Sequence, residues 1–256
     1  MKTALITGAT SGIGEATAFT FAEKGFGLIL TGRRTERLNR VAELLNSRYS
    51  AKIVTIAFDI RDRHETEKAV ASIPEDFKPV DILVNNAGLA LGLEHVQDGD
   101  ADDWDRMIDT NIKGLLYVTR AVAPLMIAGG NGHIVNIGSI AGRETYENGG
   151  VYCATKHAVD ALSKSMRMDM LENGIKVTNV CPGATETEFS EVRFKGDEKR
   201  AKKVYEGFKP LTAGDIAEII TYIVSLPRHV CVNDILIMPL AQANAVKFIR
   251  NAEYTV

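Results

Sequence analysis

Apolar runs rich in β-branched residues recur along this chain, and stretches with an apolar residue every three or four positions separate them. The runs predict strands at 3–7, 27–31, 53–60, 80–84, 133–137, 176–180 and 234–238. The periodic stretches predict helices at 14–24, 35–48, 63–72, 104–127, 150–171 and 215–226. Because the strand runs are continuously apolar rather than alternating, both faces of the sheet should be buried, which indicates parallel strands.

Strands that alternate with helices along the chain predict an α/β fold. We expect a Rossmann-type doubly wound parallel sheet of about seven strands, with helices on both faces, in a single domain spanning 1–256. Two segments depart from this pattern. The stretch 186–209 is polar and charge-rich and has the length of a substrate lid. The stretch 241–256 is a tail that either packs on a neighbouring subunit or frays.

Composition and charge narrow the classes of function. Hydrophobic residues make up 45% and charged residues 25% of the chain, as in ordinary globular proteins. A formal net charge of −3 argues against nucleic acid or an anionic membrane as a partner. No apolar run approaches the length of a membrane span. The three cysteines and the histidines show no metal-ligand spacing, so we expect no metal and a cytoplasmic protein with reduced thiols.

Three glycines follow the first predicted strand and open the first predicted helix. Gly8, Gly12 and Gly14 lie where a dinucleotide-binding backbone must turn tightly and let a pyrophosphate approach a helix N-terminus. Their spacing is Gly-x-x-x-Gly-x-Gly rather than the commoner Gly-x-Gly-x-x-Gly. Glycines that serve only a tight turn are the alternative, but the strand before them and the helix after them favour a nucleotide site.

Further motifs lie where the same fold would need them: Asn86-Ala87-Gly88, Asn111, Ser139 and Tyr152-x-x-x-Lys156. Together with the glycine loop, they make the chain resemble the short-chain dehydrogenase/reductase family from Lys2 to about Met238. The resemblance implies a catalytic tetrad of Asn111, Ser139, Tyr152 and Lys156, in which Asn111 holds a water that connects Lys156 to solvent.

The resemblance also implies a set of cofactor contacts spread along the chain. They comprise the glycine loop, an adenine contact, the Asn-Ala-Gly turn, two members of the tetrad and a nicotinamide contact. These residues are Gly8, Thr10, Ser11, Gly12, Ile13, Gly14, Asp59, Ile60, Asn86, Ala87, Gly88, Tyr152, Lys156, Pro182, Gly183 and Thr187.

The tyrosine and lysine of the tetrad suit proton transfer on physical grounds. Tyr152 and Lys156 are four residues apart in a predicted helix, so both side chains leave the same face one turn apart. The nearby ammonium, with the positive ring of an oxidised nicotinamide, should lower the pKa of Tyr152. Tyr152 then takes the alcohol proton as hydride leaves, or returns it. Ser139, after the fifth predicted strand, is expected to hydrogen-bond the substrate oxygen.

The end of the second predicted strand indicates which nucleotide binds. The sequence there is Thr31-Gly32-Arg33-Arg34, with no acid to grip a ribose 2′-hydroxyl. A guanidinium offers a planar fork to a 2′-phosphate, so Arg33 and Arg34 predict NADP as the cofactor. Two solvated arginines on a loop are the alternative interpretation.

Substrate class is indicated by one stretch only. The run from Pro182 to Ser190, followed by Val192-Arg193-Phe194-Lys195-Gly196, is similar to the branch of the family that acts on the 3-hydroxyl of small hydroxy acids such as serine, allo-threonine or 3-hydroxypropionate. Arg193 would then clamp the substrate carboxylate, while Ser139 and Tyr152 hold its hydroxyl. The alternative is a mobile surface arginine in a basic stretch.

The sequence is also compatible with other functions. Within the family, the chain could reduce 3-oxoacyl groups on a carrier protein or carbonyls in general, although the polar, arginine-bearing lid speaks mildly against a carrier-bound chain. A non-catalytic module that senses NADP is the alternative of another class, and the intact tetrad argues against it. We expect a small-molecule substrate and a homotetramer or homodimer.

Overall fold

One sheet organises the protein. The computed structural model describes residues 1–251, and its seven-stranded sheet has the order β3-β2-β1-β4-β5-β6-β9 with every neighbouring pair parallel. The chain order reverses between β1 and β4, and such a point leaves a ligand crevice at the carboxyl ends of the strands. The predicted doubly wound sheet is confirmed. Its strands are β1 (Thr3–Thr7), β2 (Gly27–Gly32), β3 (Ile53–Ala57), β4 (Ile82–Asn85), β5 (Gly132–Ile137), β6 (Ile175–Pro182) and β9 (Asp234–Ile237).

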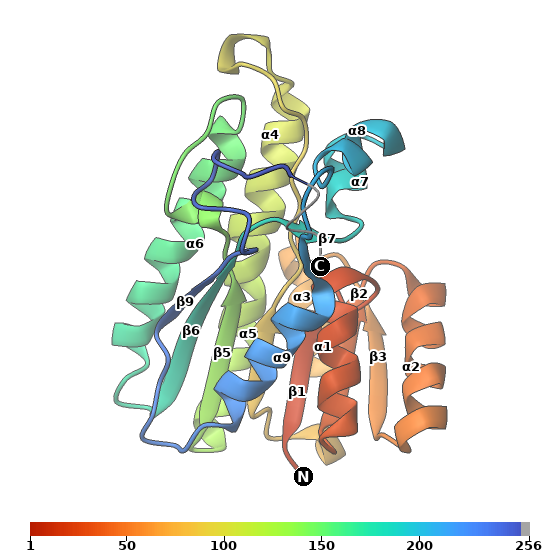
Figure 1. Cartoon of the computed structure of the whole chain (residues 1–256). Coiled ribbons are helices and arrows are strands. Elements are labelled where there is room, and N and C mark those ends of the chain that lie inside the picture. The colour runs from red at the N-terminus through yellow and green to blue at the C-terminus, as the bar shows by residue number, and fades with distance from the viewer. Residues whose placement is uncertain (252–256) are drawn as a thin grey trace.

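Helices cover both faces of the sheet (Figure 1). One face packs against α1 (Gly12–Glu23), α2 (Thr35–Tyr49) and α9 (Ala213–Ser225). The other packs against α3 (Arg63–Ala71), α5 (Leu115–Ala128) and α6 (Gly150–Asp169). Successive strand residues point to opposite faces, so Ile6 joins the first core while its neighbour Leu5 joins the second. Both cores are fully buried, which explains the continuous apolar runs in the sequence.

Two predicted elements end differently in the structure. The strand predicted at 53–60 stops at Ala57, because the side chain of Asp59 accepts the backbone N–H of Arg61 at 3.0 Å and forms a turn. The helix predicted at 104–127 is interrupted: α4 (Ala101–Ile108) passes into a π-helical turn, η3 (Asp109–Gly114), before α5 begins. Short 3₁₀ turns complete the connections at η1 (Glu75–Phe77), η2 (Val96–Asp98) and η4 (Ile140–Gly142).

A small separate unit lies above the carboxyl edge of the sheet (Figure 1). The strands β7 (Thr185–Glu186) and β8 (Leu211–Thr212) pair in parallel, and we call the chain between them the lid segment. It contains α7 (Phe189–Arg193) and α8 (Glu198–Lys203). The stretch predicted at 186–209 therefore has helical order of its own.

The tail packs against the lid segment of the same chain. Arg250 donates to the carbonyls of Glu206 at 2.6 Å and Val204 at 3.1 Å, and its guanidinium lies over the rings of Phe208 and Phe248. The expectation of a frayed tail is therefore wrong for residues 241–250. Its packing against a second subunit stays a prediction, and residues 252–256 lie outside the described part of the chain.

Three further observations bear on the classes of function. None of the helices within residues 1–251 is long and apolar enough to cross a membrane. The same residues contain no group of three histidine, cysteine or acidic side chains arranged to hold a metal ion. Cys153, Cys181 and Cys231 are all free thiols.

Candidate active site

A cleft of about 630 Å³ lies at the carboxyl ends of the strands, where the chain order reverses. Its size is typical of a small-molecule site. Every predicted site residue lines it except Gly14 and Asn111, which lie directly behind its wall. Residues scattered between positions 8 and 193 thus converge on one surface.

The glycine loop fits a close-approaching phosphate. Gly8 and Gly12 have φ angles of +66° and +55°, a conformation that other residues rarely adopt. A Cβ on Gly14 would collide with the side chain of Asn86 and the carbonyl of Gly8. The loop leads into the N-terminus of α1, where backbone N–H groups and the helix dipole favour an anion. The cradle therefore suits the pyrophosphate of a dinucleotide.

Asn86 ties this loop to the end of β4. Its side-chain amide donates to the carbonyls of Thr7 at 2.8 Å and Gly8 at 3.2 Å. The hydroxyl of Thr7 in turn accepts the backbone N–H groups of Asn86 and Ala87, each at 3.0 Å. Thr7 directly precedes the glycine loop in the sequence, and the structure shows that its hydroxyl positions the backbone of this distant turn.

The two arginines after β2 border the same cleft. Arg34 donates through Nε and Nη2 to the hydroxyl of Thr10 at 3.1 and 2.8 Å, and through Nη2 to that of Ser11 at 2.8 Å. Arg33 lies 3.7 Å from the carboxylate of Asp59. Burial alone would raise the pKa of Asp59, but hydrogen bonds from Arg61 and the charges of Arg61 and Arg33 hold this pKa below its ordinary value. These contacts place two cations beside the glycine loop.

Tyr152 and Lys156 lie in the first turns of α6, as the sequence predicts. Lys156 Nζ donates to the carbonyl of Ile137 at 2.7 Å and lies 5.9 Å from the centre of the Tyr152 ring. Burial lowers the pKa of Lys156 to about 8, because the charged ammonium is removed from water. The lysine is therefore held close to the phenol but is only weakly basic.

The chain's own groups act on the pKa of Tyr152 in the direction opposite to the one predicted for Lys156 and an oxidised nicotinamide together. Burial raises its pKa above the ordinary value, since an apolar surrounding disfavours the phenolate. The nearby hydroxyl of Tyr146 adds to this rise, whereas hydrogen bonding with Ser139 and the charge of Arg193 oppose it. Among the largest influences on the pKa of this phenol, the cation is therefore an arginine from the lid segment. Tyr152 is held in its protonated form.

Asn111 explains the break in the helix. It lies in the π-helical turn and is only 2% exposed. Its side-chain amide makes two hydrogen bonds to the backbone of Leu89: Oδ1 accepts the N–H at 2.9 Å, and Nδ2 donates to the carbonyl at 2.8 Å. π-Turns of this kind frequently occur at functional sites. A Cβ on Gly88 would lie 3.2 Å from Asn111 Oδ1 and 3.7 Å from Lys156 Nζ, so Asn111, Gly88 and Lys156 are near neighbours.

Arg193 lies in the site and not on the open surface. Its guanidinium carbon is 5.2 Å from the centre of the Tyr152 ring and 5.5 Å from that of Tyr146, and Nη2 donates to the Tyr146 hydroxyl. Its Nε is buried and has no hydrogen-bond partner within residues 1–251. A buried donor without an acceptor is costly, so this guanidinium is suited to receive an anion.

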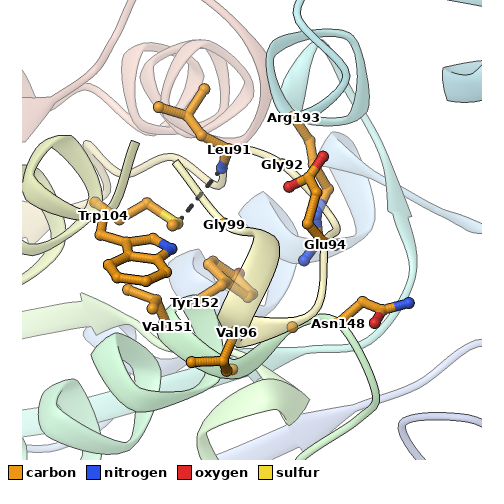
Figure 2. Close-up of a pocket in the computed structure, with 13 residues that line it drawn as sticks. Leu91, Gly92, Glu94, Val96, Gly99, Trp104, Asn148, Val151, Tyr152 and Arg193 are labelled. Carbon is orange, nitrogen blue, oxygen red and sulfur yellow. Dashed lines mark hydrogen bonds between the residues drawn. The ribbon is translucent and has the colours of Figure 1, made fainter. Parts of the chain in front are cut away.

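A second, smaller pocket adjoins Tyr152 and Arg193 (Figure 2). Trp104, Val96 and Val151 form its apolar wall, and the N–H of Leu91 bonds to the sulfur of Met107 beneath it. Its free volume is about 20 Å³, room for one water molecule or a methyl group. Tyr152 thus has little space on this side.

Several residues at the cleft were not foreseen as site residues. Tyr146, Glu188 and Phe189 lie beside predicted ones, and Gln242, Phe248 and Arg250 reach the cleft from the tail. Glu188 follows the predicted nicotinamide contact Thr187 directly, so its place in that motif was a usable signal. The tail residues carry no motif, and only the folded chain shows that they return to the site.

The chain is similar to known oxidoreductases over nearly its full length. A family model of short chain dehydrogenases matches residues 2–198. A Salmonella typhi protein named NADP-dependent 3-hydroxy acid dehydrogenase YdfG is 46% identical over 242 residues, which cover 94% of this chain and 96% of the relative. Sulfoacetaldehyde reductase 2 of Chromohalobacter salexigens is 48% identical over 240 residues, covering 93% and 94%.

Solved structures agree with the sequence relatives. The closed form of serine dehydrogenase complexed with NADP+ matches with a TM-score of 0.91 and 43% identity, covering 96% of this chain and 98% of that one. Serine dehydrogenase from Escherichia coli matches with a TM-score of 0.81 and 38% identity, covering 94% and 99%. With its glycine loop, its tetrad and these relatives, the chain belongs to the short-chain dehydrogenase family.

Proposed function

We propose that the protein is an NADP-dependent dehydrogenase that transfers a hydride between the nicotinamide and the 3-hydroxyl or carbonyl of a small hydroxy acid, such as serine, allo-threonine or 3-hydroxypropionate. The observation that carries this proposal is the guanidinium of Arg193, held between the rings of Tyr146 and Tyr152 with its Nε buried and without a partner in the described chain. A carboxylate is the group that best satisfies such a fork. The names of the 3-hydroxy acid and serine dehydrogenase relatives agree with this class.

The residues of the site have distinct tasks in this reaction. NADP supplies the hydride acceptor, or as NADPH the donor, and the glycine loop, Arg33 and Arg34 would hold it. Tyr152 keeps its proton at rest because burial raises its pKa, so its hydroxyl is ready to protonate a carbonyl oxygen during reduction. In the oxidative direction the hydroxyl first gives its proton to solvent, and the phenolate then accepts the alcohol proton. Ser139 would hydrogen-bond the same substrate oxygen.

Lys156 and Asn111 act behind the tyrosine. The lysine is anchored on the carbonyl of Ile137 and places its ammonium near the phenol ring, where a positive charge favours the phenolate during alcohol oxidation. Asn111 would hold the water that connects Lys156 to solvent. Its two bonds to the backbone of Leu89 fix the orientation of the amide.

The preference for NADP rests on the cations beside the glycine loop. Arg33 and Arg34 both line the cleft at the end of β2, where a 2′-phosphate would lie. Asp59 is also present, but its carboxylate is bonded to Arg61 at 2.6 Å, which commits it to a local ion pair. The relative whose structure holds NADP+ supports the same choice.

Two other substrate classes are the alternatives that the substrate panel tests. A sulfonate would also suit Arg193, and sulfoacetaldehyde reductase 2 is among the relatives. A carrier-bound acyl chain is opposed by the guanidinium of Arg193 beside Tyr152, because an apolar chain cannot satisfy this buried charge. The non-catalytic alternative is opposed by the complete tetrad.

We also propose that the protein is a cytoplasmic homo-oligomer, a tetramer or a dimer. Large apolar side chains are exposed at the end of α6 and near β9: Met168, Leu171, Leu236 and Leu240. We propose that these side chains form one face, since a contiguous apolar patch marks a protein–protein contact. Free thiols suit a reducing compartment. Light scattering on the purified chain measures the oligomer, and a monomer at micromolar concentration would contradict it.

A substrate panel tests the proposed function directly. With NADP⁺, kcat/KM is measured for L-serine, both threonine diastereomers, 3-hydroxypropionate, 3-hydroxybutyrate and butan-2-ol, and with NADPH for sulfoacetaldehyde and a 3-oxoacyl thioester. We expect the hydroxy acids to exceed butan-2-ol by at least tenfold, the effect of about 1.4 kcal/mol of carboxylate binding. Preference for the thioester or for the uncharged alcohol would refute the assignment.

A further inference from the structure

One guanidinium next to the glycine loop also binds the lid segment. Arg34 Nη1 donates to Glu188 Oε2 at 2.9 Å, while its other nitrogens hold Thr10 and Ser11. Glu188 immediately precedes α7, the helix that ends with Arg193. The lid segment is therefore fastened, through one carboxylate, to the cation that the proposed function assigns to the 2′-phosphate of NADP.

A second arginine holds the same carboxylate. Arg37 Nη1 donates to Glu188 Oε1 at 2.6 Å. The two carboxylate oxygens of Glu188 therefore bind two arginines one helical turn apart, Arg34 just before α2 and Arg37 in its first turn. Burial alone would raise the pKa of Glu188, but the hydrogen bonds and charges of Arg34 and Arg37 hold it below its ordinary value. Glu188 is therefore a fixed negative charge at neutral pH.

The opposite end of α7 is fastened independently. Lys195 Nζ lies 2.7 Å from Asp103 and 3.5 Å from Asp100, at the start of α4. The side chain of Asp103 is only 7% exposed, which makes this the less screened of the two fastenings. If the Glu188 end loosens, α7 is still held near Lys195, and the motion is concentrated at the Thr187 end.

Two anions cannot share Arg34 without cost, because a carboxylate and a phosphate dianion repel each other. We propose that Glu188 competes with the 2′-phosphate of NADP for Arg34, so that NADP, but not NAD, loosens the first end of the lid segment. This inference rests on the proposed function, which places the phosphate at Arg33 and Arg34. Linkage makes the effect reciprocal: the phosphate weakens the Glu188 contact by the same factor as Glu188 weakens phosphate binding.

The first test measures binding in the Glu188→Gln protein, which keeps the size of the side chain and removes its charge. Dissociation constants for NADPH and NADH follow from nucleotide fluorescence. NADPH should bind about two- to fivefold more tightly, the size expected of half-exposed ion pairs, while NADH binding stays unchanged. Glu198→Gln, which neutralises a lid carboxylate paired with Lys202 at 3.5 Å, is the matched control and should change neither constant.

The second test measures the lid segment itself by limited trypsin digestion. The cleavage site nearest the Glu188 end is Arg193, whereas Lys199, Arg200, Lys202 and Lys203 follow the Lys195 fastening and serve as internal references. In the wild-type protein, saturating NADP⁺ should give faster cleavage after Arg193 than saturating NAD⁺. In Glu188→Gln the two nucleotides should give equal rates, because the charge that distinguishes them is gone.

The results separate this inference from the proposed cofactor site. Weaker or unchanged NADPH binding in Glu188→Gln, or an equal gain for NADH, overturns the competition. Slower wild-type cleavage with NADP⁺ than with NAD⁺ overturns it as well. If Arg34→Ala loses the preference for NADPH while Glu188→Gln changes nothing, the phosphate site stands and only the coupling fails. If Arg34→Ala keeps the preference, both the site and the coupling are wrong.

Discussion

The guanidinium of Arg193 lies 5.2 Å from the centre of the Tyr152 ring, within the range of a cation–π contact. The arginine comes from α7 in the lid segment and the tyrosine from α6 in the main fold. The positive charge of Arg193 lowers the pKa of Tyr152, against the rise that burial causes. A residue of the lid segment thereby affects the acidity of the group that we propose transfers the proton.

Removing Arg193 should therefore change the pH dependence even for a substrate that it does not bind. In Arg193→Ala, loss of a nearby cation disfavours the phenolate, so the pKa of Tyr152 rises further. The alkaline rise in kcat/KM for oxidation of an uncharged alcohol should move to higher pH. Arg200→Ala, which removes a lid arginine stacked on Phe194, is the control. An unshifted profile in Arg193→Ala would mean that the two side chains are not coupled in solution.

Tyr152→Phe should abolish turnover but leave cofactor binding intact. The change removes only the transferable proton, and general acid–base catalysis is typically worth a factor of about 10² to 10⁴. Stopped-flow or steady-state absorbance at 340 nm measures the rate, and nucleotide fluorescence measures cofactor binding. Tyr222→Phe, at an exposed position on α9, should behave like the wild type. A rate above about a tenth of wild type in Tyr152→Phe would place the proton donor elsewhere.

Replacing Arg33 and Arg34 together by alanine should weaken NADP binding selectively. Charged hydrogen bonds contribute about 1.5 to 3 kcal/mol each. Because the Arg33 and Arg34 side chains are 57% and 43% exposed, solvent screening reduces this contribution. We therefore expect a combined loss of NADP binding free energy of about 2 kcal/mol or more. Binding of NAD should change little, because it lacks the 2′-phosphate. Titrations with both nucleotides check this, and equal losses for the two would refute the assignment.

Gly14→Ala should damage the nucleotide loop. The added methyl group would collide with the Asn86 amide and the Gly8 carbonyl, and overpacking of this kind costs about 1 to 3 kcal/mol. Melting temperatures with and without NADP⁺ should both fall, and the stabilisation by NADP⁺ should shrink. Gly214→Ala, whose methyl group would only touch Thr212 at 3.5 Å, is the matched control. Equal behaviour of the two variants would show that the loop can relax around the extra atom.

The sheet, the glycine loop and the Tyr152–Lys156 pair were predictable because each depends on local spacing. Continuous apolar runs identify buried parallel strands, and four residues make one helical turn. The π-turn at Asn111 was visible only as a polar residue within an apolar helix. Its cause lies in the distant backbone of Leu89, which no local pattern contains.

Other properties of the site depend on burial and on chain segments that meet only in the fold. A fall in the pKa of Tyr152 was predicted from Lys156 together with an oxidised nicotinamide, whereas desolvation by the chain alone raises this pKa. Tyr146 contacts Arg193, which is 47 residues away in the sequence. Glu188 contacts Arg34, which is 154 residues away. Neither separation follows from a motif, so the sequence could identify the reacting groups but not what holds them.

The most direct test of the central claim compares two substrates in wild type and Arg193→Ala. The claim is that the guanidinium clamps a carboxylate and so directs the 3-hydroxyl toward Tyr152. The measurement is kcat/KM with NADP⁺ for a hydroxy acid and for an uncharged alcohol of similar size, with Arg193→Lys as the variant that keeps the charge but loses the fork. A loss of tenfold or more on the acid, in both variants and beyond any loss on the alcohol, is the predicted result. Parallel losses on the two substrates would contradict the clamp.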